Sequence, residues 1–465
     1  MKIKICLLSL SLCLIVSFLF VFSSCNIILG VANAKINENG ELVLVYGDGS
    51  EQNLGVVVGN NGADGVNGLD GADGADGVDG ANGIDGANGA DGADGSDGSI
   101  IISGGESNLP TAVAKGLRST VRILCNFKAT VQQGGWYPSS GNTTIKEYSS
   151  AGSGVIYKLD KDSGDAFIIT NYHVVYDSSS NTSNGVSDDI TIYLYGAEYK
   201  EKAIKATYVG GSLYYDIAVL RVEDNEQLKN SDACEVTPAN SDKIVVGESA
   251  IAIGNAQDLG ISSTSGVVSV DSEHITMTAA DGKTEVTFRV MRVDTAINSG
   301  NSGGGLYNGK GELIGIVNAK IVYDGVDGIG YAIPSNVAVS VAENIIYYCH
   351  GNDSENLQKA VIGVTLSTTD SKSVYDSSTG IISIVETIEI YKAESGSLSD
   401  GVLKAGDVLI SVTANGKTVS ITRQHHFFDM MLDIRAGDTV TLKLLRNGQE
   451  ISVDITVTEK QLVKY

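Results

Sequence analysis

The chain has 465 residues, which is too long for a single hydrophobic core, so two or three domains joined by linkers are expected. It carries 56 acidic residues (Asp and Glu) against 32 basic ones (Lys and Arg), a formal net charge of −24, which argues against nucleic acid or an anionic membrane surface as a partner. Aromatic residues make up only 6%, whereas glycine occurs 56 times and must therefore be concentrated in part of the chain.

The N-terminus has the features of an export signal. Lys2 and Lys4 precede an almost wholly apolar run from Ile5 to Phe22. The next segment, Phe22-Ser23-Ser24-Cys25, resembles the lipobox of bacterial lipoproteins, so residues 1–25 are predicted to be a signal peptide with lipidation at Cys25.

Two other interpretations of this segment stay open. The chain could be cleaved after Ala34, or the apolar run could remain as an uncleaved anchor, since it nearly spans a bilayer. All three interpretations place the body of the chain outside the cytoplasm. It would be anchored to the cell membrane by a lipid or an apolar segment, or secreted.

A short β segment and a glycine repeat follow. Alternation of polar and apolar residues around Glu41–Tyr46 predicts a small hairpin-like segment over residues 26–58. From Gly59 to Gly98 glycine occupies every third position, giving 13 G-X-Y triplets whose Y residues are nine Asp and four Asn. This period is typical of a collagen triple helix, because only glycine fits at the crowded axis.

Residues 59–98 also allow a second interpretation. The repeat has no proline to preset an extended conformation and no lysine to pair with its aspartates, so three wound strands would need cations or trimeric flanking domains. The alternative is an extended, self-repelling linker. In either form the stretch is a spacer, on the order of 100 Å long if fully extended.

The cysteines beyond the N-terminal segment do not indicate a disulfide framework. Cys125, Cys234 and Cys349 are an odd number, lie far apart and lack the spacing of metal ligands. We expect them to be small apolar residues of the interior.

After Ser107 the composition becomes that of a globular β protein. Short apolar, β-branched segments alternate with turn residues, as expected for a sandwich or barrel. The predicted strands are Thr120–Asn126, Gly154–Leu159, Ala166–Thr170, Ile190–Tyr195, Ile217–Val222, Ser249–Ile253, Gly266–Val270, Glu285–Val293, Glu312–Val317 and Gly328–Ile333.

One helix is expected to close this series. Ser335 can cap it, and Gly351 lies just past its end. Its apolar face is formed by Val337, Val341, Ile345 and Cys349. A separate α+β module follows from Val361 to Val457, with a helical stretch around His426–Ile434 and strands at Gly380–Val385, Asp407–Val412, Thr439–Leu445 and Glu450–Val457.

Three short stretches carry residues suited to nucleophilic catalysis. Ser302 lies in Asn298-Ser299-Gly300-Asn301-Ser302-Gly303-Gly304-Gly305-Leu306, where glycine freedom lets the N–H groups of Gly300 and Ser302 point into one pocket. His173 ends the apolar strand Ile168-Ile169-Thr170-Asn171-Tyr172-His173. Asp216 stands at the head of another, in Asp216-Ile217-Ala218-Val219-Leu220. Each signal alone is more typical of a turn or of a structural residue.

Taken in the order His, Asp, Ser, these stretches resemble the three active-site motifs of the HtrA (Deg) family of chymotrypsin-like serine proteases. The similarity extends from about Val113 to the C-terminus and includes the segments 314–319 and 328–336. The resemblance implies a mainly β fold with two six-stranded barrels over residues 108–350 and a serine endopeptidase active site between them. No metal or organic cofactor is implied.

The resemblance also implies a role for each motif residue. Ser302 would be the nucleophile, His173 the general base and Asp216 the residue that orients the histidine. The N–H groups of Gly300 and Ser302 would form the oxyanion hole. A substrate pocket near Ile297, Ile316, Val317 and Asn318 would favour a small aliphatic residue before the cleaved bond.

The last region, residues 360–459, resembles a PDZ domain, an α+β module that binds peptide C-termini. Val361-Ile362-Gly363-Val364 matches the loop whose N–H groups hold a terminal carboxylate, and Leu403-Lys404-Ala405-Gly406-Asp407-Val408-Leu409 matches a turn into a strand. A peptide would add as a strand at the edge of the domain; the alternative is an occluded or merely structural module.

The nucleophile loop departs from the family pattern at two positions. Proline is common in the family at the position of Ser299, and alanine or proline at that of Gly305. Both changes are expected to loosen the loop that shapes the oxyanion hole, which in this family often depends on ligand or assembly for its active form.

Three functions are consistent with these features. The leading hypothesis is a homotrimeric, extracytoplasmic HtrA-type endopeptidase that cleaves unfolded or misfolded exported proteins. The second is a catalytically silent adhesin or scaffold on a collagen-like stem. The third is a peptide-gated signalling protease with one defined substrate.

Overall fold

The computed structural model describes residues 31–39, 41–46, 50–56, 109–132, 143–197, 200–319, 328–349 and 357–464. The predicted signal peptide with its lipidation site at Cys25, and the glycine repeat 59–98, lie outside these residues. The chain divides into two compact units, residues 1–97 and 98–465. None of the helices in the described ranges is both long and apolar enough to cross a membrane.

The first unit contains a three-stranded antiparallel sheet. Strands β1 (Val31–Ile36), β2 (Glu41–Tyr46) and β3 (Glu51–Val56) lie in that order. The sequence predicts a hairpin here, and the sheet has one strand more. Val43, at the centre of the middle strand, is buried.

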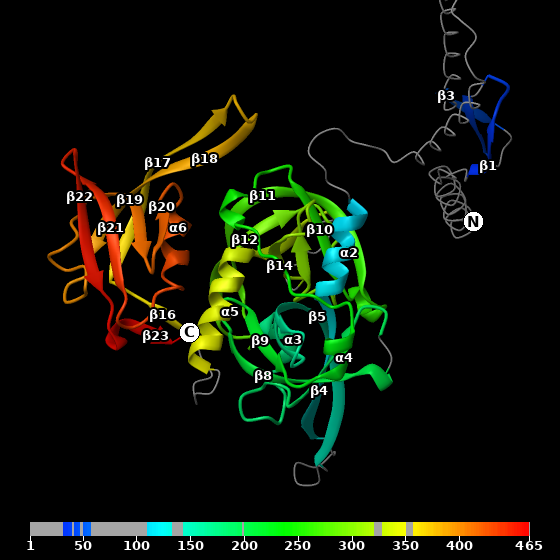
Figure 1. Ribbon diagram of the computed structural model, residues 1–465, viewed down its shortest axis with the longest axis horizontal. Helices are drawn as coiled ribbons and strands as arrows, with labels where there is room; N and C mark the ends of the chain where they lie inside the picture. Colours follow the sequence, from blue (N-terminus) through cyan, green and yellow to red (C-terminus); the bar gives the residue numbers. More distant parts are fainter. Residues whose placement is uncertain are drawn as a thin grey trace, which may run out of the picture. The chain divides into compact units, whose positions relative to one another are not determined.

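The second unit begins with two closed six-stranded barrels (Figure 1). The first has the strand order β4-β5-β6-β9-β8-β7, with a short helix α3 (Tyr172–Val175) after β6 and α4 (Glu226–Asn230) after β9. Its strands are β4 (Thr120–Gln132), β5 (Thr143–Asp160), β6 (Asp165–Thr170), β7 (Asp189–Leu194), β8 (Ile204–Ser212) and β9 (Ile217–Val222). A short 3-10 helix, η1 (Lys200–Lys202), precedes β8.

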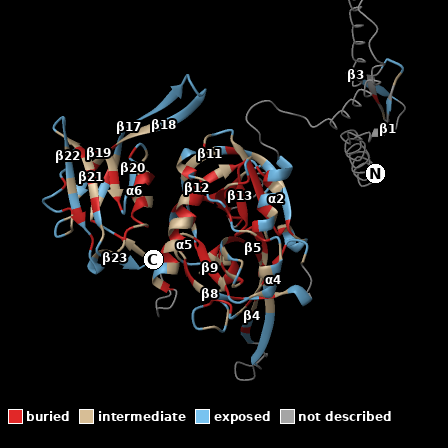
Figure 2. Ribbon diagram, in the orientation of Figure 1, coloured by how far each residue is buried: buried red, intermediate tan, exposed pale blue. Residues whose placement is uncertain are grey.

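The second barrel has the order β10-β11-β12-β15-β14-β13. Its strands are β10 (Ser249–Gly254), β11 (Ser262–Thr278), β12 (Glu285–Val293), β13 (Gly305–Tyr307), β14 (Leu313–Val317) and β15 (Gly330–Pro334), and short 3-10 helices η2 (Ser241–Lys243) and η3 (Ala256–Asp258) flank β10. Every residue of β13, β14 and β15 is buried, as Figure 2 shows by the concentration of red inside the barrels. The mainly β fold with trypsin-like barrels predicted from the sequence is confirmed.

Helix α2 (Leu109–Ser119) precedes the first barrel but packs on the second. Gly116 allows this close approach, because a Cβ atom there would lie 2.4 Å from Ile253 Cδ1 of β10 and 3.0 Å from the Tyr307 ring of β13. The Lys115 ammonium donates a hydrogen bond to the carbonyl of Lys310 at 2.9 Å. This helix has no counterpart among the elements predicted from the sequence.

Helix α5 (Ser335–Cys349) follows the second barrel and packs against β8 and β9 of the first. Its predicted apolar face is buried, and a Cβ at Gly210 of β8 would lie 2.9 Å from both Ile345 and Cys349. The hydroxyl of Ser335, the predicted cap, donates to the carbonyl of Ala239 at 2.8 Å. Helix α2 therefore contacts the second barrel, which follows it along the chain, and α5 contacts the first barrel, which precedes it.

Among the described residues, Cys125, Cys234 and Cys349 are free thiols. Cys125 and Cys349 are buried and Cys234 is half-buried, which agrees with the predicted interior positions. Burial is the main reason why the pKa of Cys125 is raised to about 12, so this thiol stays protonated at neutral pH.

The C-terminal module has its own core and a sheet of order β17-β18-β19-β21-β22, with β20 beside β19. Its elements are β16 (Gln358–Ala360), β17 (Val364–Asp376), β18 (Ile381–Ala393), β19 (Val408–Ala414), β20 (Lys417–Ser420), α6 (Gln424–Met430), β21 (Thr439–Arg446), β22 (Gln449–Thr456), η4 (Glu459–Gln461) and β23 (Leu462–Lys464). β16 and β23 form a separate two-stranded pair.

Buried contacts join this module to the barrels. The fully buried Asn344 of α5 donates to the carbonyls of Gln358 and Leu432 at 2.7 and 3.0 Å, and its side-chain oxygen accepts from the Gln358 N–H at 3.0 Å. Leu432 itself belongs to the hydrophobic core of the barrels. The Lys359 ammonium adds a hydrogen bond to the Tyr215 hydroxyl at 2.8 Å.

Candidate active site

Turns on both barrels bring three reactive side chains together. His173 lies on α3 directly after β6, and Asp216 occupies the turn between β8 and β9, both in the first barrel. Ser302 lies in the turn before β13 of the second barrel. The side chains therefore meet where the two barrels face each other.

The distances form a continuous hydrogen-bonded chain. Nε2 of His173 lies 2.8 Å from Oγ of Ser302, and its Nδ1 lies 2.7 Å from Oδ2 of Asp216. Because an ionised carboxylate only accepts, Nδ1 carries the proton and Nε2 is left to accept from the serine hydroxyl. This is the arrangement that a general base needs before it takes a proton from a nucleophile.

The Asp216 carboxylate is buried yet fully satisfied. Its Oδ1 accepts the backbone N–H of His173 at 3.0 Å, and its Oδ2 also accepts from the Asn318 amide at 2.8 Å. Its carbonyl accepts from the Asn171 side chain at 2.9 Å. These bonds hold Asp216 at a φ of 50°, in the left-handed region that residues other than glycine seldom adopt.

Glycines allow the nucleophile turn to approach neighbouring backbone. Gly303 has a φ of +82°, and a Cβ there would lie 2.2 Å from the carbonyl oxygen of Ser153. Ser302 is anchored by its own carbonyl, which accepts from the Ser153 N–H at 2.8 Å. Any side chain at position 303 would push the nucleophile away from His173.

The peptide unit between Ser299 and Gly300 is held in a definite orientation. The Ser299 carbonyl accepts from the Gln257 N–H at 2.7 Å. Because carbonyl and N–H of a trans peptide point in opposite directions, the Gly300 N–H is directed away from Gln257. Gly300 itself has a φ of +92°, where a Cβ would lie 2.2 Å from the Asn255 carbonyl oxygen.

The segment that positions the Ser299 carbonyl is itself braced. Gln257 and Asp258 have φ values of 52° and 58°. Asp258 forms an ion pair with Arg122 of the first barrel at 2.8 Å and accepts from the Asn255 amide at 3.0 Å. Strain of this kind persists only where surrounding contacts support it, and it gathers at functional sites.

Of the four residues expected to form a substrate pocket, three have side chains that are buried or bonded elsewhere in the protein. Ile316 and Val317 are 0% exposed and belong to the barrel cores, so their side chains are not available to a substrate. The Asn318 side chain is bonded to Asp216 instead. Ile297 is half-buried and packs against Gly330, where a Cβ would lie 2.6 Å from it.

Gly305 is tightly packed, contrary to the expected loosening. A Cβ there would lie 2.4 Å from the Tyr307 ring, whose hydroxyl lies 3.0 Å from both Ser119 Oγ and Thr120 Oγ1. Glycine at this position makes room for a buried tyrosine that joins β13 to the end of α2.

The predicted carboxylate-binding loop lies between β16 and β17. The N–H of Val361 donates to the Gln461 carbonyl at 2.9 Å, so it is not available to a peptide. Gly363 has a φ of +78°, and its carbonyl accepts from the Glu394 N–H at 2.8 Å. This leaves the N–H groups of Ile362, Gly363 and Val364 as the candidate donors.

Two residues that shape the site, Ser153 and Gln257, were not predicted from the sequence, and Asn318 has a different role from the one expected. Ser153 binds the Gly300 carbonyl through its hydroxyl at 2.7 Å, Gln257 holds the Ser299 carbonyl, and Asn318 binds Asp216. Only Asn318 gave a signal, because it directly follows the buried strand β14. The contacts of Ser153 and Gln257 join segments that lie far apart in the sequence, so no local pattern predicts them.

Comparison with known proteins identifies close relatives of the chain. Residues 152–316 match the family model described as a trypsin-like peptidase domain. The chain is 32% identical to the serine protease Do-like HtrA of Lactococcus lactis over 76% of its own length and 83% of the relative. It is 30% identical to the protein of that name from Bacillus subtilis, over 77% and 74%. Identity to the periplasmic pH-dependent serine endoprotease DegQ of Escherichia coli is 31%, over 67% and 60%.

Proposed function

The chain belongs to the HtrA family of serine proteases and is a serine endopeptidase, and we propose from this premise that Ser302, His173 and Asp216 are its catalytic triad. The observation that carries the proposal is the unbroken hydrogen-bonded chain from Ser302 Oγ through the His173 ring to Asp216.

The chemistry follows from the protonation states that these contacts support. His173 takes the Ser302 proton at Nε2 as Oγ attacks a peptide carbonyl, and it then protonates the leaving amine. Asp216 keeps Nδ1 protonated and stabilises the imidazolium that forms in each step. Water, activated by the same imidazole, hydrolyses the acyl-enzyme.

The N–H groups of Gly300 and Ser302 are proposed to stabilise the oxyanion. The bond from Gln257 to the Ser299 carbonyl supports this role, because the trans peptide then directs the Gly300 N–H away from Gln257. The loop would then be ready for a substrate without rearrangement of that peptide.

We propose unfolded or misfolded exported polypeptides as the substrates. A cleaved chain must enter the site in extended form, which folded proteins seldom offer. Ile297, the half-buried member of the expected pocket, would contact a small aliphatic residue before the cleaved bond. Ile316 and Val317 are 0% exposed, backbone included, so they would support the wall of the pocket from behind without touching the substrate.

The C-terminal module is proposed to bind peptide C-termini in the manner of a PDZ domain. β17 ends the five-stranded order of its sheet, so its outer edge can accept an added strand. Ile362, Gly363 and Val364, at the start of this strand, would supply N–H groups to the terminal carboxylate. The Gln424 amide, 3.4 Å from the Leu366 carbonyl, would have to yield to the peptide.

An extracytoplasmic location and a homotrimeric state are also proposed. The apolar segment 5–22 with Cys25 supports export and lipid anchoring, and one relative is named as periplasmic. Trimers would suit a three-stranded winding of the repeat 59–98, which would hold the enzyme away from the membrane.

The decisive experiment compares digestion of β-casein by the protein and by its Ser302→Ala variant. We expect the variant to lose at least about a thousandfold in kcat, because the nucleophile is absent. Equal turnover by the two proteins would remove Ser302 from the mechanism and leave the silent scaffold as the better description. Little cleavage without an added C-terminal peptide, and strong cleavage with it, would indicate the peptide-gated protease.

A further inference from the structure

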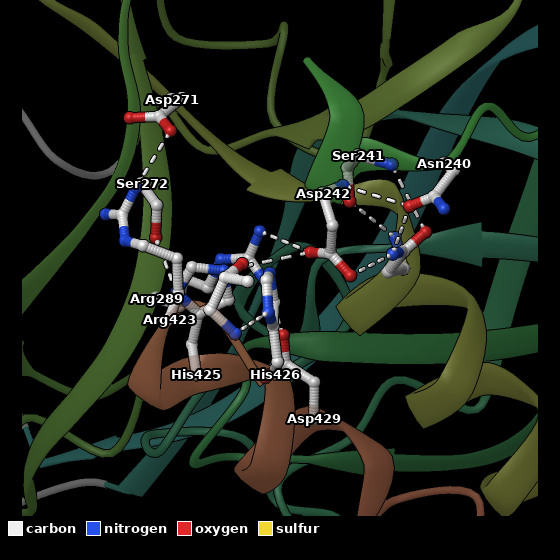
Figure 3. Close-up of polar contacts among 12 residues, drawn as sticks. Asn240, Ser241, Asp242, Asp271, Ser272, Arg289, Arg423, His425, His426 and Asp429 are labelled. Carbon is white, nitrogen blue, oxygen red and sulfur yellow. Dashed lines mark hydrogen bonds and ion pairs between the residues drawn. The ribbon is translucent and has the colours of Figure 1, made fainter. Parts of the chain in front are cut away.

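A second cluster of reactive side chains lies between the second barrel and the C-terminal module (Figure 3). Asp242 comes from η2 beside the barrel, and His425 and His426 come from α6 of the module. One ligand-type atom of each residue lies within 4.8 Å of the other two, and Oδ1 of Asp242 is 3.8 Å from Nε2 of His425. Two imidazoles and one carboxylate are donors typical of a zinc site.

Each of the three groups is oriented by a further contact. Nδ1 of His426 lies 3.0 Å from the Ser420 carbonyl and 3.4 Å from the Thr422 N–H, and the shorter contact favours the tautomer that donates to the carbonyl. Nδ1 of His425 lies 3.4 Å from Ser272 Oγ. Oδ2 of Asp242 accepts from the Asn336 amide at 2.8 Å. A ring nitrogen held by a carbonyl leaves the other nitrogen as a metal donor, the usual arrangement around zinc histidines.

Carboxylates outnumber guanidinium groups around the cluster. Two guanidinium groups, those of Arg289 and Arg423, are paired with four carboxylates: Asp242, Asp429, Asp271 and Glu386. Arg289 is 5% exposed, so its own charge is shielded from bulk water. Asp242 Oδ1 has a second lone pair for a divalent ion beside its bond to Arg289.

Cavities give the cluster access to solvent on two sides. One of about 340 Å³ and another of about 490 Å³ are both lined by Asp242 and His426, and the larger also by His425. A water molecule from either could complete a four-coordinate site. Bonds of about 2.0–2.1 Å place tetrahedral ligand atoms roughly 3.4 Å apart, so the three side chains need to close by about 1 Å.

We propose that Asp242, His425 and His426 bind a divalent transition-metal ion of the zinc type, and that the ion joins α6 to the second barrel. The ion would be structural, with no part in the hydrolysis at Ser302. The ligands are separated by 183 residues in sequence, which is why no metal-binding spacing is visible in the chain.

Titration of the full chain with Co²⁺, which replaces zinc and reports its geometry by visible absorption, tests the proposal. We expect one intense band, typical of a tetrahedral ion, that is displaced by one equivalent of Zn²⁺. His425→Gln and His426→Gln should each reduce the intensity at least about tenfold. Asp271→Asn, which alters a carboxylate of the same cluster outside the three ligands, should retain the band. A Cys234→Ser background removes the half-buried thiol as a rival ligand.

A second measurement does not depend on whether the variants fold. In the wild-type protein Zn²⁺ should slow hydrogen exchange of the α6 amides at least about tenfold and leave β22, on the other side of the module, unchanged. The proposal is overturned if the cobalt band persists in both histidine variants, if no intense band forms, or if α6 exchanges equally fast with and without zinc.

Discussion

At the scale of single residues, the reactivity of Ser302 depends on how firmly Asp216 is held. Its Oδ2 serves two donors, the His173 ring and the Asn318 amide, and these bonds define the plane in which the imidazole lies. Asn318 is therefore a positioning residue, which acts on the nucleophile through two intervening groups.

Replacement of this amide tests the role. Asn318→Ala should lower kcat about tenfold, the effect of losing one hydrogen bond to a charged group, with little change in KM. Steady-state kinetics on an unfolded substrate would measure both constants. A rise in KM with kcat unchanged would instead place Asn318 in the substrate pocket, as the sequence suggested.

Asp407 is a second buried carboxylate, far from the active site in sequence. Burial alone would raise its pKa, but hydrogen bonds from Arg446 at 2.6 and 2.7 Å and from the Lys404 N–H at 2.8 Å outweigh burial and hold the pKa below its ordinary value. A carboxyl group with a depressed pKa stabilises the fold above its unfolded-state pKa of about 3.9.

Asp407→Asn should therefore lower the free energy of unfolding by about 3 kcal/mol at pH 7, because Arg446 loses its charged partner. The difference from wild type should shrink as the pH falls below about 4, where the carboxyl of the unfolded chain takes up a proton, and it should vanish below the lower pKa of the folded state. Urea unfolding at several pH values measures both effects. A difference that did not change with pH would contradict the role of the ion pair.

At the scale of elements, β13 shows how a glycine can serve packing instead of flexibility. Gly305 faces the Tyr307 ring, and the tyrosine hydroxyl ties β13 to the junction of α2 and β4.

Gly305→Ala is expected to destabilise the protein by about 1–3 kcal/mol, since the new methyl group overlaps the ring. In a Tyr307→Leu background the same substitution should cost much less, because the ring is gone. Thermal or urea unfolding of the four proteins gives the coupling energy. Equal costs in both backgrounds would show that the ring is not what excludes the methyl group.

Elements formed by local sequence patterns could be predicted, whereas elements that depend on contacts with distant parts of the chain could not. β9 and β14 could be predicted because their apolar runs are local patterns, and α5 because its buried residues recur at helical spacing. Helix α2 was missed: it has only three buried residues, and its partner Tyr307 lies almost 190 residues away. Among the site residues, Ser302 stands in a motif, whereas the contacts of Gln257 depend on a loop from another part of the barrel.

At the scale of the whole molecule, the barrels and the C-terminal module share a buried polar connection. Asn344 makes three hydrogen bonds across this junction, beside the ion pairs of Arg289 with Asp429 and of Arg423 with Asp271. The module should therefore unfold together with the barrels in the wild-type protein.

Asn344→Ala should separate the two events. Loss of its bonds leaves two carbonyls and one N–H of the junction unsatisfied, at a cost of about 2–3 kcal/mol. Calorimetry should show two transitions where the wild type has one. A single transition at the wild-type temperature would contradict this coupling.

Because α2 and α5 each contact the barrel at the other end of the protease region, the enzyme could be assembled from two fragments. A cut between β9 and β10 would leave His173 and Asp216 on one fragment and Ser302 on the other, so each fragment alone would be inert. The first fragment would carry α2, which packs on the second barrel, and the second fragment would carry α5, which packs on the first barrel. The enzyme is therefore suited to use as a split reporter, in which proteolysis appears only when two fused partners bring the halves together.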